Sequence, residues 1–220
     1  MKKLKITTIL CGLILFITAC GPSGNKIENS STASPSINEG EVTIGNQVWT
    51  TKNLDVAKYR NGDSISEEKD NTAWAKLTTG AWCYYENNTA NGTKYGKLYN
   101  WYAVNDPRGL APNGYHIPTD ADWTKLTDNL GDEAGTKMKS TSGWKNNGNE
   151  TNSSGFAGLP GGCSFRIWGF NGISSDGLWW SSSESNTNDA WNRHLSDYDG
   201  NVYGEASNKQ AGFSVRCIKD

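Results

Sequence analysis

The chain has 220 residues, of which 35% are hydrophobic and 20% are charged, and its formal net charge is -2. This length suits one well-packed domain or at most two small ones. No basic cluster follows residue 5, so the positive surface that nucleic-acid binding requires is missing and we expect no nucleic-acid partner. Glycine is frequent, with 25 residues. Together with many Asn and Ser residues it favours turns and short strands and excludes coiled coils and helical bundles.

The first 19 residues have the pattern of a secretory signal peptide. Lys2, Lys3 and Lys5 precede an apolar run at residues 6–18, which is too short for a permanent membrane-spanning helix. The run ends in Ile17-Thr18-Ala19-Cys20, which resembles the bacterial lipobox. The resemblance implies that Cys20 becomes the lipidated N-terminus, with palmitate among its acyl chains, and contacts the membrane through them. Several buried chains make such anchoring lasting. The alternative is an ordinary cleaved signal followed by a chance cysteine.

Residues 20–40 are expected to form a flexible tether. They are rich in Ser, Asn, Gly and Pro and contain little apolar surface, so burial cannot offset the entropy cost of ordering them. Removal of residues 1–19 changes the formal net charge from -2 to -5, because three lysines are lost. Gly21, rather than an acidic residue, follows Cys20, which resembles outer-membrane sorting. We therefore expect a lipid-anchored protein of the outer membrane or the cell surface.

The folded domain is predicted to span residues 41–220. Residues 41–54 place apolar residues on either side of a Gly45-Asn46 turn, as in a β-hairpin. Residues 55–80 read as a loop with one short helix near 70–76. Residues 81–85 read as an aromatic strand followed by a turn at 87–92, and residues 97–105 carry aromatic side chains at helical spacing.

The clearest predicted helix begins after Pro118. Thr119 is a good N-cap, Asp122 lies three residues later, and Gly131 ends the segment. A second short helix is expected at residues 133–139. Four short strands are predicted beyond it, at residues 177–182, 190–196, 201–203 and 212–218.

Six motifs in this chain resemble those of one family: Gly45-Asn46-Gln47-Val48-Trp49, Leu98-Tyr99-Asn100-Trp101-Tyr102-Ala103-Val104, Gly114-Tyr115-His116-Ile117-Pro118-Thr119-Asp120, Leu159-Pro160-Gly161-Gly162, Trp179-Trp180-Ser181-Ser182 and Gly212-Phe213-Ser214-Val215-Arg216-Cys217. That family is the Fibrobacter succinogenes major paralogous domain, and the resemblance covers nearly all of residues 42–220. It implies an exported, often lipidated protein of Bacteroidetes or Fibrobacteres. The implied fold is α+β and C-type-lectin-like, related to formylglycine-generating enzymes, with two short helices, small twisted antiparallel sheets and long loops. The family's own activity is largely undefined.

Three cysteines lie in the predicted domain, and an exported domain can keep disulfides. Cys83 and Cys217 lie within motif-like segments, so we expect a disulfide between them and an unpaired, buried Cys163. A loop of this length contributes about 4 to 5 kcal/mol in the chain-entropy picture. The fold resemblance also raises a copper-dependent cysteine oxidase as a remote alternative. Nothing around Cys163 or Cys217 reproduces such a site, and reactive cysteines need an activating environment.

Trp179 and Trp180 are adjacent in a predicted strand. Because side chains alternate along a strand, the two indoles cannot enter the same core, and one of them must face outward or into a second layer. An exposed indole beside polar groups would suit the face of a sugar. Coverage of the second indole by residues 142–176 is the competing interpretation. The residues predicted to contact a ligand are Trp168, Trp180, Glu184, Asn186 and Trp191.

No metal and no cofactor is expected. Glu184-Ser185-Asn186 and Trp191-Asn192-Arg193 are faintly similar to the calcium-binding triplets of C-type lectins, but the proline is missing and arginine replaces the ligand aspartate. Asp197, Asp199 and Asn201 read as a solvated turn. The two histidines, His116 and His194, belong to no hydrolase motif, although a paired-carboxylate glycosidase leaves no fixed spacing and stays open.

These observations predict a non-catalytic, lectin-like envelope lipoprotein that binds an extracellular glycan or an envelope protein. The alternatives are a purely structural module of the envelope and, more remotely, the copper-dependent cysteine oxidase.

Overall fold

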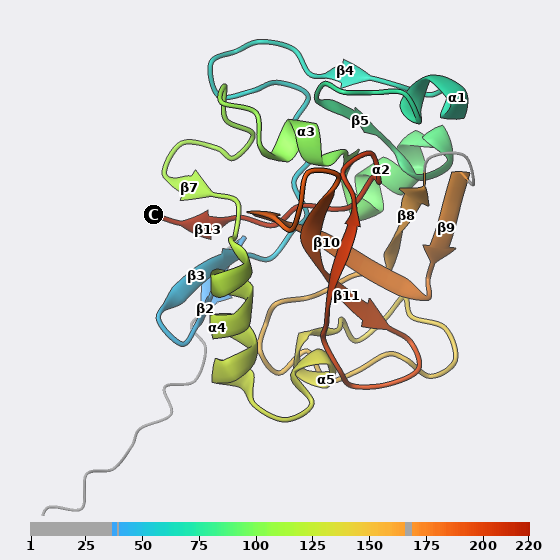
Figure 1. Ribbon diagram of the computed structural model, residues 1–220. Helices are drawn as coiled ribbons and strands as arrows, with labels where there is room; N and C mark the ends of the chain where they lie inside the picture. Colours follow the sequence, from blue (N-terminus) through green and yellow to red (C-terminus); the bar gives the residue numbers. More distant parts are fainter. Residues whose placement is uncertain (1–36, 39, 166–168) are drawn as a thin grey trace, which may run out of the picture. The chain divides into compact units, whose positions relative to one another are not determined.

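The computed structural model describes residues 37, 38, 40–165 and 169–220, and they form a mixed α+β domain built on three small sheets (Figure 1). The first sheet has the strand order β1 (Ile37–Asn38), β2 (Glu41–Ile44), β3 (Gln47–Thr50), β13 (Ile218–Lys219) and β7 (Tyr115–His116). The second has the order β12 (Tyr203–Asn208), β11 (Asp189–Ser196), β10 (Asp176–Glu184), β8 (Gly161–Phe165) and β9 (Gly169–Ile173). The third comprises β4 (Ser66–Glu67), β5 (Ala81–Cys83) and β6 (Leu98–Tyr99).

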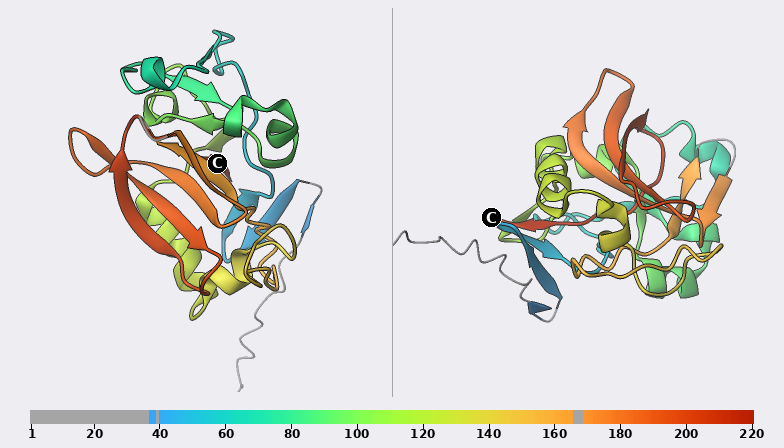
Figure 2. Two further views of the ribbon diagram at one scale, coloured as in Figure 1. Left: turned by 90° about the vertical axis from the view of Figure 1, so that its right-hand side faces the viewer. Right: turned by 90° about the horizontal axis from the view of Figure 1, so that it is seen from below.

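The helices of the described residues are short, apart from one. They are α1 (Asn71–Trp74), the 3-10 helix η1 (Tyr85–Asn87), α2 (Thr89–Tyr95), α3 (Trp101–Val104), α4 (Asp120–Leu130) and α5 (Ala134–Met138). In Figure 2 the second sheet, drawn in orange to red, lies beside the yellow-green helix α4. This arrangement confirms the predicted α+β class.

The first sheet brings the two ends of the domain together. Strands β2 and β3 form the predicted hairpin, with Val42 opposite Trp49. Gly45 in its turn has φ +61°, which glycine adopts without strain. Ile218 of β13 then pairs with Trp49. Strand β1 at Ile37–Asn38 pairs with β2, so the first sheet also includes two residues that precede the predicted domain start at residue 41.

Helix α4 has the predicted limits because its signals are local. The Thr119 side chain accepts a hydrogen bond from the backbone of Asp122, whose carboxylate accepts one from the Thr119 backbone, and Gly131 caps the other end. The side chains of Trp123 and Leu126, on the inner face of this helix, are fully buried. The ring of Trp123 lies 4.7 Å from that of Trp49, centroid to centroid, which joins the helix to the first sheet. Helix α5 falls within the predicted range 133–139.

The second sheet contains two strands that the sequence pattern missed. β10 and β11 include the predicted segments 177–182 and 190–196, whereas β12 begins only at Tyr203. Residues 212–218 are not one strand, since they make isolated bridges to three separate neighbours before β13. Strands β8 and β9 were not predicted because their glycine-rich sequences lack alternation. Helix α2 begins within the turn predicted at 87–92.

Buried side chains form three hydrophobic clusters. We name each by one tryptophan: the Trp180 core, the Trp179 core and the Trp74 core. Trp179 and Trp180 are both fully buried, on opposite faces of β10. The prediction that they enter different layers is therefore confirmed.

The three cysteines among the described residues are buried free thiols, so the predicted disulfide between Cys83 and Cys217 is wrong. The reason is the alternation along β5: Trp82 enters the Trp180 core, which also holds Cys217, and Cys83 enters the Trp74 core. Cys163 is buried and unpaired, as expected. Burial raises the pKa of each of these three thiols to about 12. A thiol of that kind is a poor nucleophile and a poor copper ligand.

Candidate functional site

The structure describes four of the five predicted ligand residues, and one of these four is not exposed as predicted. Trp168 lies outside the described residues. Trp180 is fully buried; its Nε1 donates to the Tyr99 carbonyl at 2.8 Å, and its ring centroid lies 4.4 Å from that of Phe213. The prediction that Trp180 offers a face to a sugar is wrong, because the second layer that receives this indole is itself a packed core.

The neighbouring indole is covered by the long connection between α5 and β8. Trp179 packs edge to face against Phe156, with 5.7 Å between ring centroids. Its Nε1 donates to Asn53 Oδ1 at 2.8 Å. The competing interpretation, in which residues 142–176 cover one of the two indoles, therefore applies to Trp179.

The other three predicted residues lie close together in the chain: Glu184 ends β10, Asn186 lies in the turn that follows, and Trp191 lies near the start of β11. Glu184 forms an ion pair with Lys209, whose Nζ also donates to the Thr187 carbonyl at 2.8 Å. Asn186 Oδ1 accepts hydrogen bonds from the backbone of Asn188 and Asp189. The polar groups of Glu184 and Asn186 are thus engaged in bracing the turn. The exposed aromatic surface that was expected beside them is reduced to Trp191, which is half-buried.

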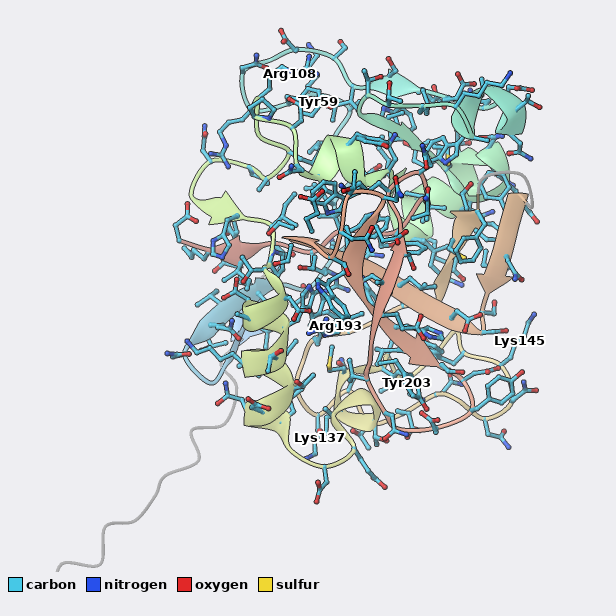
Figure 3. The ribbon with its side chains drawn as sticks, in the orientation of Figure 1. Tyr59, Arg108, Lys137, Lys145, Arg193 and Tyr203 are labelled. Atoms are coloured by element: carbon cyan, nitrogen blue, oxygen red, sulfur yellow. The ribbon has the colours of Figure 1, made fainter. Side chains whose placement is uncertain are left out.

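Arg193, the residue that departs from the lectin calcium pattern, fastens the second sheet to helix α4. Its Nη1 donates to Asp120 Oδ1 at 2.5 Å and its Nη2 to Thr124 Oγ1 at 3.3 Å. Figure 3 shows Arg193 beside this helix. Within the described ranges, no three His, Cys, Asp or Glu side chains are arranged to hold a metal ion.

An exposed aromatic surface does exist, but on the next turn of the same sheet. Tyr198 is 81% exposed and Tyr203 is 38% exposed, and they are the large hydrophobic side chains that face solvent in the described part of the chain. Both belong to residues 197–203, which join β11 to β12 and which we name the tyrosine loop. Exposed aromatic side chains are frequent on binding surfaces.

The polar groups of the tyrosine loop are held in place. The Tyr203 hydroxyl donates to Asp199 Oδ2 at 2.5 Å, and the Asn201 backbone donates to Asp199 Oδ1 at 2.9 Å. The buried Lys139 donates from Nζ to the Asp199 carbonyl at 2.7 Å. These contacts fix the loop backbone and one aromatic ring, so less conformational entropy is lost when a ligand binds.

His194 extends this surface along the sheet. Its Nε2 lies 2.8 Å from Asp176 Oδ1, its Nδ1 lies 3.8 Å from Glu205 Oε1, and its ring centroid lies 6.0 Å from that of Tyr203. Partial burial lowers the pKa of His194. The hydrogen bond to Asp176 and the charges of Asp176 and Glu205 outweigh this effect, so the pKa lies above its usual value.

Sequence reasoning missed the tyrosines because it interpreted Asp197, Asp199 and Asn201 as a solvated turn and did not consider the aromatic residues beside that turn. The available signal was the placement of Tyr198 and Tyr203 on either side of a turn centred on Gly200. The other end of the domain carries a second cluster, in which the Arg108 guanidinium lies 4.1 Å from the Tyr59 ring centroid (Figure 3). Its charge is neutralised by Asp106 and Asp63.

The second histidine is not part of a nucleophilic relay. His116 and Ser182 line one shallow cleft of about 240 Å³. The His116 ring nitrogens face carboxylates, with Nδ1 2.8 Å from Asp220 Oδ1 and Nε2 3.7 Å from Asp122 Oδ2. The Ser182 hydroxyl donates a hydrogen bond to the Ile117 carbonyl at 3.1 Å. Its proton is therefore directed to the backbone rather than to a ring nitrogen of His116.

The model of the Fibrobacter succinogenes major domain family matches residues 42–219. The chain belongs to this family, and the resemblance drawn from its motifs is confirmed. No curated protein matches the chain, and no solved structure does. No helix among the described residues has the length and apolar character needed to cross a membrane.

Proposed function

We propose that the domain is a non-catalytic, lectin-like module that binds an extracellular carbohydrate polymer, carried by a lipid-anchored protein of the outer membrane or cell surface. The observation that carries this proposal is the tyrosine loop, where the partly exposed ring of Tyr203 lies beside the oriented side chains of Asp199 and Asn201, and Tyr198 is exposed in the same loop. Family membership supports an exported, surface-protein setting. The anchor at Cys20 lies outside the described residues and rests on the lipobox resemblance.

The physical argument for a sugar is the combination of flat and polar groups. Aromatic rings pack against the C–H face of a pyranose, and carboxylate or amide side chains accept and donate hydrogen bonds to its hydroxyls. The open surface around Tyr198 suits a segment of a polymer better than a small molecule that must be enclosed. Each contact is weak, so repeated units along a polymer would raise the avidity.

The C-type-lectin-like fold is part of the same proposal. It is supported by the pairing of both chain ends in the first sheet, by helices α4 and α5, and by a second sheet that emerges from long connections.

An envelope protein is the second candidate for the partner, and one observation favours it. Strand β12 is an edge of the second sheet, and its first four residues are exposed. Its sequence contains neither proline nor lysine, the residues that most often prevent an edge strand from pairing with another chain. An extended segment of a partner protein could add to this edge by β-augmentation.

The test is affinity electrophoresis of the purified full chain through gels containing bacterial or plant polysaccharides, followed by a glycan array. Retardation by a polysaccharide that is lost in Tyr198→Ala and Tyr203→Ala is the expected result. Tyr102→Ala, at a half-buried tyrosine of α3, is the matched control. If every polysaccharide leaves migration unchanged, or if the control loses retardation to the same extent, the carbohydrate proposal fails. Crosslinking on intact cells then tests the protein partner.

A further inference from the structure

A second concave surface lies on another part of the domain, between the segment that follows β3 and helix α2. The cleft has a volume of about 320 Å³ and is lined by residues 51–53, 55, 92–96 and 159. Leu159 and the largely buried Tyr95 contribute apolar wall. Thr51 and Thr93 add hydroxyl groups. We name it the Lys52–Lys94 cleft, after its two exposed cations.

The charges that line this cleft are unbalanced. Lys52 and Lys94 form none of the ion pairs found among the described residues. Lys94 Nζ lies 4.8 Å from the Tyr95 ring centroid. Asp55 is the carboxylate on the lining, and it is neutralised by Lys97 at 2.5 Å. The cleft therefore has an excess of about two positive charges, although the chain as a whole is acidic.

The floor of the cleft is rigid. Asn53 Oδ1 accepts from Trp179 Nε1 at 2.8 Å and from Arg216 Nε at 2.7 Å. Asn53 Nδ2 donates to the Tyr95 carbonyl at 2.8 Å and to Ser214 Oγ at 3.1 Å. With four hydrogen bonds, this amide is locked between the cleft and the core.

A third cation lies directly beneath this floor. Arg216 is fully buried, and its guanidinium donates to Asn53 and to the carbonyls of Thr50, Phe156 and Ala157. It forms no ion pair with a carboxylate among the described residues. A buried charge without a counter-ion is poorly screened. The positive potential of Arg216 is therefore felt at Asn53 and in the cleft more strongly than it would be if the guanidinium were in water.

We propose that the Lys52–Lys94 cleft binds the anionic group of an acidic sugar, with the sugar ring against Leu159 and Tyr95. The shared chemistry is a negatively charged group of oxygen atoms on a single pyranose, either the carboxylate of a uronic acid or a sulfate ester. The volume accommodates one ring rather than an oligosaccharide. This site uses none of the residues of the tyrosine loop and stands independently of the function proposed there.

The experiment is isothermal titration of the purified full chain with glucuronic acid, glucose 6-sulfate and glucose. We expect at least one acidic sugar to bind, glucose to give no detectable heat, and binding to weaken from low to physiological ionic strength. The tighter of the two acidic sugars identifies the carboxylate or the sulfate as the preferred group. Lys52→Gln/Lys94→Gln should raise the Kd by about tenfold or more, and Lys52→Arg/Lys94→Arg should retain binding.

Lys76→Gln/Lys145→Gln is the control, because it removes two exposed lysines outside the cleft and changes the net charge by the same amount. It should leave the Kd unchanged, as should Tyr198→Ala. The proposal is overturned if neither acidic sugar binds, if glucose binds equally well, or if the control variant loses as much affinity as the cleft variant. Loss of polysaccharide retardation in Tyr198→Ala tests the tyrosine loop separately.

Discussion

The guanidinium of Arg216 lies over the ring of Phe156, 4.5 Å from its centroid. This contact joins the last segment of the chain to the long connection that covers Trp179. Because Arg216 also donates to the carbonyls of Phe156 and Ala157, it holds the shape of a loop that has no strand or helix of its own at this point. The geometry needs the planar fork of arginine, which lysine cannot reproduce.

Arg216→Lys is therefore expected to lower the free energy of unfolding by about 2 to 4 kcal/mol, since several carbonyls would lose their donor in a buried site. Urea denaturation of the full chain, followed by tryptophan fluorescence, measures the change. Lys145→Arg, at an exposed lysine, serves as the control and should leave the midpoint where it is. An Arg216→Lys midpoint equal to that of the wild type would contradict the role given to this fork.

Trp180, which the sequence predicted to contact a ligand, and Tyr198, which we propose for that role, should respond differently to replacement by alanine. Trp180→Ala removes a fully buried indole and should destabilise the domain by about 3 to 5 kcal/mol. Tyr198→Ala removes an exposed ring and should leave thermal stability nearly unchanged while weakening polysaccharide binding. Thermal melts and affinity gels of both variants check this. A stable Trp180→Ala variant with reduced sugar affinity would restore the original interpretation of Trp180.

His194 should make stability depend on pH. Its pKa is raised in the folded state, despite partial burial, by Asp176 and Glu205, so the folded protein binds the proton more tightly than the unfolded chain does. The stabilisation is fully present below the unfolded pKa of about 6.5 and is lost as the pH rises through the higher folded pKa. We expect wild type to lose more stability than His194→Gln when the pH is raised through this window. Denaturant titrations on each side of it provide the measurement, and equal pH slopes would be the contrary result.

Thiol counting tests the cysteine assignment. Cys83, Cys163 and Cys217 are buried thiols whose pKa burial raises to about 12. They should resist a thiol reagent in the native protein, and all three should react after unfolding without reductant. Cys163→Ser should reduce the count of unfolded thiols by one. If only a single domain thiol reacts in the unfolded wild type, two of these cysteines are bridged after all.

Lipid attachment at Cys20 gives a prediction outside the described residues. Labelled palmitate should be incorporated by the wild type and lost in Cys20→Ser, which should also leave the membrane fraction. Cys163→Ser is the control, because that thiol is buried in the domain. Incorporation by Cys20→Ser would place the lipid elsewhere or remove the lipobox interpretation.

Sequence reasoning succeeded where an element is defined by residues close together in the chain, and it failed where distant residues define the element. Helix α4 was predicted to within a residue because Thr119, Asp122 and Gly131 act over one turn of helix. The Gly45-Asn46 hairpin was predicted for the same reason. Residues 212–218 were wrongly predicted to form one strand, because partners distant in sequence set their pairing, including the bridge from Ser164 to Gly212.

The candidate site was predicted only in part, for a related reason. Alternation along a strand correctly separated Trp179 from Trp180, but it could not say what lies on each side. The Trp180 face is closed by Phe213 and Tyr99, which are distant in sequence. Exposure of Tyr198 likewise depends on which loops fail to cover it. Composition therefore predicted exposed aromatic residues, and the tertiary structure decides which aromatic residues are exposed.

Strand β1 also determines how the domain responds to mechanical load. It comprises two residues at the outer edge of the first sheet, immediately after the N-terminal segment, whereas β13 lies in the interior of that sheet between β3 and β7. A pull from the N-terminal side acts first on this short edge strand. Peeling it away breaks few hydrogen bonds and leaves the β2–β3 hairpin clamped by the C-terminal strand. Under such a load the domain can release the two residues of β1 while the tyrosine loop and the Lys52–Lys94 cleft remain folded.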